Sequence, residues 1–186
     1  MKKLLLLLLC VPLMGLTQNF ENYSLKGDED RLKGQWEKSI HNFTLAIQEL
    51  EKINSKLVTY EGEKINRDKL LGIFYFRKGQ STLSLTEQLG KEYYSSRLGF
   101  FWYSEKLLNQ AVSDFTKSIN LYDKYFIDDG RPDSGFYPGF VKRGDARKLL
   151  DAGKGTINFC NDYKKGCDFD KEDNYIGCKK YYTDCK

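Results

Sequence analysis

Hydrophobic and polar residues follow a helical period through most of the chain. From Ser39, a small residue is followed one turn later by Phe43 and three positions after that by Ala46. These offsets place all three on one helical face, against which a partner helix can nest. The same pattern recurs in a second segment at Ala111, Phe115 and Ser118. A weaker third copy runs over residues 159–166, so the pattern predicts helices packed in pairs.

A shorter phrase precedes each of these segments. It consists of an aromatic residue, two further residues, a basic residue and a glycine: Tyr23-x-x-Lys26-Gly27, Tyr75-x-x-Lys78-Gly79 and Phe140-x-x-Arg143-Gly144. The aromatic ring fills space between helices, and the glycine lets a neighbouring helix come close. Because the two phrases recur in the same order three times, the sequence predicts an all-α protein built from repeated helix hairpins.

Together the two phrases resemble the tetratricopeptide repeat, whose pattern is W-x2-L-G-x2-Y followed by A-x3-F. The resemblance implies an antiparallel helix-hairpin solenoid of about three repeats, at about residues 20–53, 70–124 and 136–168. The chain departs from the family in three ways. Lys or Arg stands where the family has Leu, the closing proline is missing, and the second aromatic of the first helix is replaced by Asp30, Thr82 and Arg147.

The resemblance also implies a function, because the first helix of each repeat lines a groove that binds proteins or peptides in this family. By position, the groove would carry Ser24, Asp28, Arg31, Phe76, Gln80, Leu83, Val141, Asp145 and Lys148. The Lys and Asn arrangement with which some members clamp a terminal carboxylate is absent at these positions. We therefore do not expect binding of chaperone tails.

Residues 87–107 interrupt the second repeat and are rich in aromatic residues. Four successive aromatic residues at 100–103 cannot all face inward on one helix. Either extended helices bury the cluster against the second repeat, or part of it forms an exposed surface for a partner or a glycan. The candidate residues of that surface are Tyr93, Tyr94, Phe101 and Trp102.

Four cysteines follow the last repeat, at Cys160, Cys167, Cys178 and Cys185. An antiparallel helical hairpin places the outer two opposite each other, and likewise the inner two. We therefore predict Cys160–Cys185 and Cys167–Cys178 disulfides, which staple a capping helix over residues 173–186. A four-cysteine zinc site is the alternative, but its usual spacings are shorter.

The N-terminus has the order of a secretory signal peptide over residues 1–17. Lys2 and Lys3 precede an apolar stretch from Leu4 to Leu16, which is too short to cross a bilayer, and Gly15 and Thr17 are small. We expect a mature domain at 18–186 without a transmembrane segment, periplasmic in a bacterium or extracellular. Disulfides fit that compartment.

Composition narrows the function further. The chain has 186 residues, a formal net charge of +4 and one histidine, His41, which excludes a histidine-cluster metal site. No run of Lys and Arg forms a stripe for nucleic acid, and no nucleotide or hydrolase motif predicts a cofactor or an enzyme. A hydrolase based on paired carboxylates stays open, since acids are numerous. We expect an exported, non-catalytic scaffold for a protein or peptide partner; the alternative is a glycan- or cell-wall-binding protein.

Overall fold

The computed structural model describes residues 19–92, 99–130, 136–151, 158–169 and 176–185, with the backbone alone for 91–92 and 99–103. In these ranges the chain forms seven helices and one β-hairpin. In order they are α1 (Asn19–Leu32), α2 (Trp36–Glu51), β1 (Leu57–Tyr60), β2 (Glu63–Asn66), α3 (Arg67–Glu92), α4 (Gly99–Asp128), α5 (Tyr137–Asp151), α6 (Cys160–Asp168) and α7 (Ile176–Asp184).

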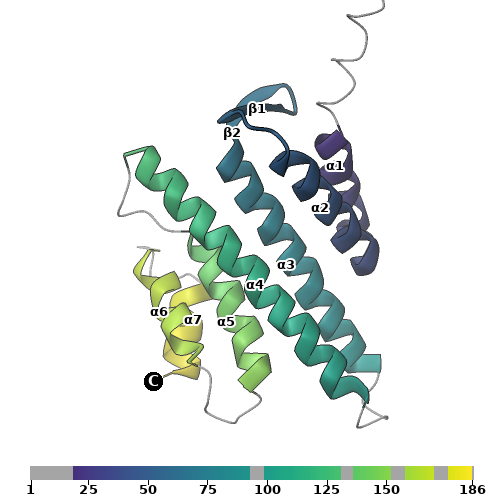
Figure 1. Cartoon of the computed structure of the whole chain (residues 1–186). Helices are drawn as coiled ribbons and strands as arrows, with labels where there is room; N and C mark the ends of the chain where they lie inside the picture. Colours follow the sequence, from purple (N-terminus) through teal and green to yellow (C-terminus); the bar gives the residue numbers. More distant parts are fainter. Residues whose placement is uncertain (1–18, 93–98, 131–135, 152–157, 170–175, 186) are drawn as a thin grey trace, which may run out of the picture.

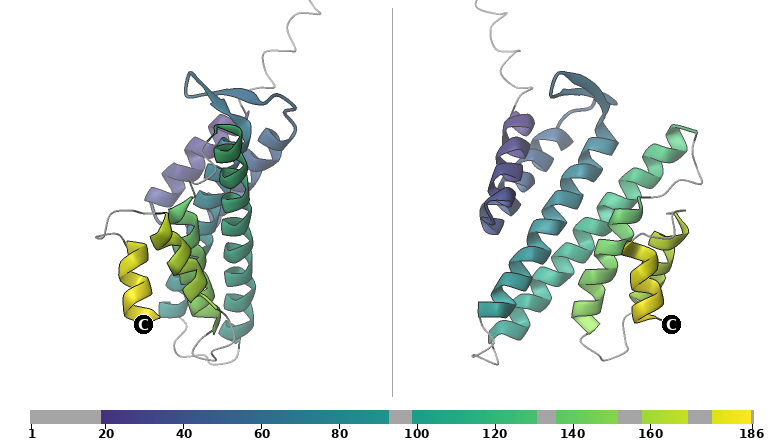
Figure 2. Two further views of the ribbon diagram at one scale, coloured as in Figure 1. Left: turned by 90° about the vertical axis from the view of Figure 1, so that its left-hand side faces the viewer. Right: turned by 180° about the vertical axis from the view of Figure 1, so that it is seen from behind.

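Each helix packs against the next along the chain, which is the arrangement of a solenoid. The long helices α3 and α4 lie side by side in the middle, with α1 and α2 on one flank and α5 to α7 on the other (Figure 1). Seen from behind, α1 and the α6–α7 pair stand at opposite ends of the molecule (Figure 2). The all-α solenoid predicted from the sequence is confirmed, with one β-hairpin added.

The glycine of each repeat phrase lies against an aromatic ring of the paired helix. Gly27 faces Phe43 and Gly79 faces Phe115, both of which are fully buried. In the third pair Gly144 faces Tyr163. The close approach expected at these glycines is therefore made by a ring, and the two sequence phrases meet as one contact in all three helix pairs.

The expected interruption at 87–107 is mostly helical. Residues 87–92 continue α3, and residues 99–107 form the beginning of α4. The second repeat is thus enlarged by longer helices rather than by a separate insert, as one of the two interpretations predicted. The side chains of its candidate surface lie outside the described residues.

The hairpin of β1 and β2 was not predicted. Its two-residue turn consists of Glu61 and Gly62, both with positive φ (50° and 79°), a conformation that suits a tight hairpin. Asn66 ends β2 and begins α3, because its side-chain oxygen accepts hydrogen bonds from the backbone N–H groups of Asp68 (2.9 Å) and Lys69 (3.2 Å). The hairpin therefore lies between α2 and α3, and its Val58 joins the hydrophobic cluster that contains Phe20 of α1 and Phe43 of α2.

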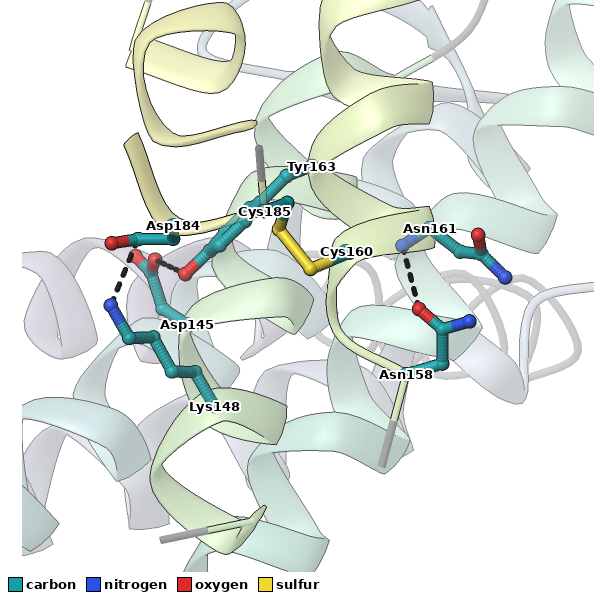
Figure 3. The surroundings of a disulfide bond; sticks show 8 residues. All are labelled: Asp145, Lys148, Asn158, Cys160, Asn161, Tyr163, Asp184 and Cys185. Carbon is teal, nitrogen blue, oxygen red and sulfur yellow. Dashed lines mark hydrogen bonds and ion pairs between the residues drawn. A yellow bond between two sulfur atoms is a disulfide. The ribbon is translucent and has the colours of Figure 1, made fainter. Parts of the chain in front are cut away.

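At the other end, α7 is tied to α6 by the two disulfides that the sequence predicts. Cys160 pairs with Cys185 at a Cα–Cα distance of 5.7 Å, and Cys167 pairs with Cys178 at 4.5 Å. Gly177 lies directly against the backbone of α6. Figure 3 shows the Cys160–Cys185 bond. Helix α7 packs on α6 and also contacts α5, so it covers this end of the solenoid.

Two further expectations concern the described residues. No helix among them is both long and apolar enough to span a membrane. In the same ranges, no cluster of three or more His, Cys, Asp or Glu side chains is arranged to hold a metal ion.

Candidate partner-binding groove

The first helices of the three repeats, α1, α3 and α5, border one open cleft of about 140 Å³. Arg31 reaches it from α1, and Trp36 from the start of α2. Four residues come from α3 and one from α5: Gln80, Leu83, Ser84, Glu87 and Lys142. Arg31, Gln80 and Leu83 were expected in the groove, so the structure brings these three together.

The chemistry of this cleft is mixed. Trp36 is half-buried and offers part of an indole face, Gln80 offers an amide, and Arg31 and Lys142 are cationic while Glu87 is anionic. Such a surface suits a polypeptide segment, which carries apolar, amide and charged groups together. The cleft contains no buried nucleophile and base in contact, and among the described residues nothing in it resembles a catalytic pair.

Asp28, another expected groove residue, does not line this cleft, and its carboxylate is already paired. It accepts a hydrogen bond from Nε of Arg31 at 3.2 Å and forms a second ion pair with Arg77 of α3. The ion pair with Arg77 links the first repeat to the second. The carboxylate of Asp28 also orients the guanidinium of Arg31 at the rim of the cleft.

Three of the expected groove positions face the interior instead. Ser24 and Val141 are buried, and the ring of Phe76 packs on Phe115 (5.8 Å between centroids) and edge-on against Phe136 (5.0 Å). All three stand three residues before the repeat glycine. Phe76 and Val141 pack toward the second helix of the pair, whereas Ser24 bonds to Tyr60 of the hairpin.

The last repeat presents its groove residues to the cap. Asp145 accepts a hydrogen bond from the hydroxyl of Tyr163 (2.9 Å) and pairs with Lys180 of α7, while Lys148 pairs with Asp184 of α7 at 2.8 Å (Figure 3). Asp145 and Lys148 are therefore not brought to the cleft that holds Arg31 and Gln80. They stabilise the capping helix.

In the second and third repeats, the basic residue of the phrase forms an ion pair between the paired helices. Lys78 donates to the buried carboxylate of Asp114 at 3.2 Å, and Arg143 and Arg147 both contact that of Asp162, at 2.7 and 2.9 Å. These pairs stand where the family has an apolar contact. The second oxygen of Asp114 has no hydrogen-bond partner in the described residues, and burial raises the pKa of this carboxyl.

Sequence reasoning missed four cleft residues: Trp36, Ser84, Glu87 and Lys142. Lys142 stands two positions before its repeat glycine, as does Arg77 in the second repeat. Both side chains reach toward the preceding repeat. Aligning the repeats by their glycines therefore indicates that this position faces the neighbouring repeat. The remaining candidate surface, Tyr93, Tyr94, Phe101 and Trp102, lies outside the residues whose side chains are described, and it stays a prediction.

Comparison with known proteins agrees with this architecture. No family model matches the chain. The AimR transcriptional regulator of Bacillus phage phi3T is 25% identical over 127 residues, covering 61% of this chain and 34% of that protein, so the chain spans about a third of that relative's length. The Arabidopsis OM64 TPR domain superposes with a TM-score of 0.55 at 17% identity, covering 90% of this chain and 94% of that one. The chain thus has the fold of a tetratricopeptide-repeat domain.

Proposed function

We propose that the chain is an exported, non-catalytic scaffold that binds a segment of a protein or peptide in the cleft between α1, α3 and α5. The observation that carries the proposal is the convergence of three repeats on one mixed surface around Gln80. A solenoid exposes such a concave face by construction, and it is the usual binding surface of repeat proteins. The tetratricopeptide-repeat fold favours an interaction scaffold over an enzyme.

Export is supported by two independent features. The N-terminal residues have the basic, apolar and small order of a signal peptide. Two cysteine pairs at the C-terminal end lie at bonding distance, and such pairs persist in oxidising compartments. The role of the phage regulator in transcription is not carried over, because the chain spans about a third of that protein.

The test compares one blocked cleft with one matched control. Gln80→Trp places a large ring in the cleft, whereas Gln48→Trp places the same ring on the exposed face of α2. The proteins captured from the native cell envelope are identified by mass spectrometry for both variants and for the wild type. A partner retained by Gln48→Trp and lost by Gln80→Trp supports the cleft; equal capture by both variants refutes it.

A further inference from the structure

The outer edge of β1 carries backbone groups that no neighbouring strand uses. The two-residue turn makes Tyr60 and Glu63 a hydrogen-bonded pair, and such pairs alternate along an antiparallel ladder. Thr59, opposite Lys64, therefore directs its N–H and C=O away from β2. Within the described ranges, no loop or side-chain hydrogen bond reaches these two groups of Thr59.

Beside this edge lies a second cleft, larger than the groove at about 440 Å³. Phe20, Ile53 and Val58 give it apolar walls, and Glu21 and Ser55 stand at its border. It lies at the N-terminal end of α1, whereas Arg31 of the groove lies near the other end. Eleven helical residues separate the two places, a distance of about 16 Å, so the clefts are distinct.

The hairpin that forms this edge is held in place by α1. The backbone N–H of Glu61 donates to the carboxylate of Glu21 at 2.8 Å, and the hydroxyl groups of Tyr60 and Ser24 are 3.1 Å apart. The ring of Tyr60 also stacks on Phe20, with 6.4 Å between centroids. A fixed edge costs less entropy to bind than a flexible one.

We propose that β1 binds an extended peptide by strand addition, with one apolar side chain of that peptide in the cleft beside Phe20 and Ile53. The unpaired N–H and C=O of Thr59 favour a peptide in an extended conformation, because such a peptide presents a backbone C=O and N–H that can bond to both groups. Sheet edges that avoid such pairing are very short or carry lysine or proline. The strand Leu57–Tyr60 has four residues but carries neither lysine nor proline.

Leu57 is the other residue of β1 whose backbone groups point away from β2, and Ser55 binds both of them. Its hydroxyl donates to the carbonyl of Leu57 at 2.7 Å and accepts from the N–H of Leu57 at 3.3 Å. The side chain of Ser55 thus takes up both backbone groups of Leu57, as a residue of a neighbouring strand would. Replacing it by alanine frees both groups of Leu57, so Ser55→Ala tightens peptide binding severalfold.

The probes are capped hexapeptides of sequence Thr-x-Thr-Val-Thr-Lys, in which x is alanine, leucine or phenylalanine. The purified chain is titrated with each, and the amide signal of Thr59 is followed by NMR. Leucine or phenylalanine at x binds about tenfold tighter than alanine, because that side chain enters the apolar cleft. Hydrogen exchange at the Thr59 amide slows when the peptide is bound.

Two controls distinguish pairing with the backbone of β1 from nonspecific binding. Thr59→Pro removes the outward N–H and abolishes binding, and edge strands tolerate proline at such a position; Thr59→Val keeps the N–H and binds as the wild type does. On the wild-type chain, a backbone N-methylated copy of the leucine peptide does not bind. Equal binding by both Thr59 variants, or by the N-methylated peptide, overturns the proposal.

The experiment also distinguishes the edge from the groove. Gln80→Trp, which blocks the groove, leaves hexapeptide binding unchanged if the two sites are separate. A loss of hexapeptide binding in Gln80→Trp would place the peptide in the groove and overturn the assignment to β1.

Discussion

Arg143 of α5 donates two hydrogen bonds to the buried carboxylate of Asp162 of α6. Its Nη2 lies 2.7 Å from Oδ1, and its Nε lies 3.1 Å from Oδ2. Lys78 and Asp114 stand at the equivalent positions of the second repeat. An ion pair thus replaces the leucine contact that tetratricopeptide repeats usually have. Both charges of a buried pair lose their hydration, so removing one partner leaves the other buried and unpaired, which destabilises the fold.

Removing one partner of the Arg143–Asp162 pair is therefore expected to be costly. Asp162→Ala leaves the mostly buried guanidinium of Arg143 without its carboxylate and lowers the free energy of unfolding by about 3–5 kcal/mol. The double variant Arg143→Leu with Asp162→Leu restores an apolar contact and loses much less. Urea unfolding followed by circular dichroism measures both; a double variant less stable than the single one contradicts this account.

The repeat glycines provide a graded test of the close helix approach. A methyl group at Gly144 would lie 2.5 Å from the ring of Tyr163, at Gly79 2.8 Å from Phe115, and at Gly27 3.1 Å from Phe43. Overpacking costs about 1–3 kcal/mol, and replacing a helical glycine by alanine gains about 0.5–1 kcal/mol, so the net effect depends on how close the ring lies.

The glycine-to-alanine variants should accordingly lose stability in the order Gly144, Gly79, Gly27. In Gly27→Ala the two contributions nearly cancel, so it serves as the matched control. Thermal unfolding of the three variants gives the ranking. Equal melting temperatures would show that the rings move aside freely and that close packing is not what these glycines provide.

Reduction of the disulfides is expected to release α7 without unfolding the rest. The bonds close sequence separations of 25 and 11 residues, each worth about 3 kcal/mol in the chain-entropy model. Hydrogen exchange should rise in α6 and α7 and stay unchanged in α1 to α4. Intact mass should increase by four hydrogens, and no increase would rule out two disulfides.

The buried carboxyl of Asp114 is expected to make the stability of the protein fall as the pH rises. Burial raises its pKa above the ordinary value of 3.8, so the folded state retains a proton that the unfolded state has lost. Its contribution to stability is present below pH 3.8 and is lost as the pH rises through the raised pKa. Relative to Asp114→Asn, the wild type should lose stability from pH 3.8 upward; a constant difference across that range contradicts the assignment.

Much of the fold could be predicted because it depends on short-range periodicity. The glycine and aromatic phrases repeat within each helix pair, and Cys160 and Cys167 match Cys185 and Cys178 in any antiparallel hairpin. The β-hairpin was missed because residues 57–66 lie between two repeats, although Val58, Thr59 and Tyr60 before a Glu-Gly turn favour strands.

The groove could be predicted only in part. Helical position shows which face a residue occupies, and Arg31 and Gln80, chosen on that basis, line one cleft. It does not show which long side chain from the neighbouring repeat reaches across. The pairing of Asp28 with Arg77 and of Asp145 with Lys180 depends on the distance between repeats, which the sequence of one helix does not contain.

The binding role of the groove is tested most directly by site-specific photocrosslinking in the native cell envelope. A benzophenone side chain is placed at Gln80 in the cleft or at Gln48 on the exposed face of α2, and crosslinked peptides are sequenced. The account predicts one polypeptide segment crosslinked from Gln80 and absent from Gln48. The same products from both positions, or none from Gln80 while another face yields a specific partner, would contradict it.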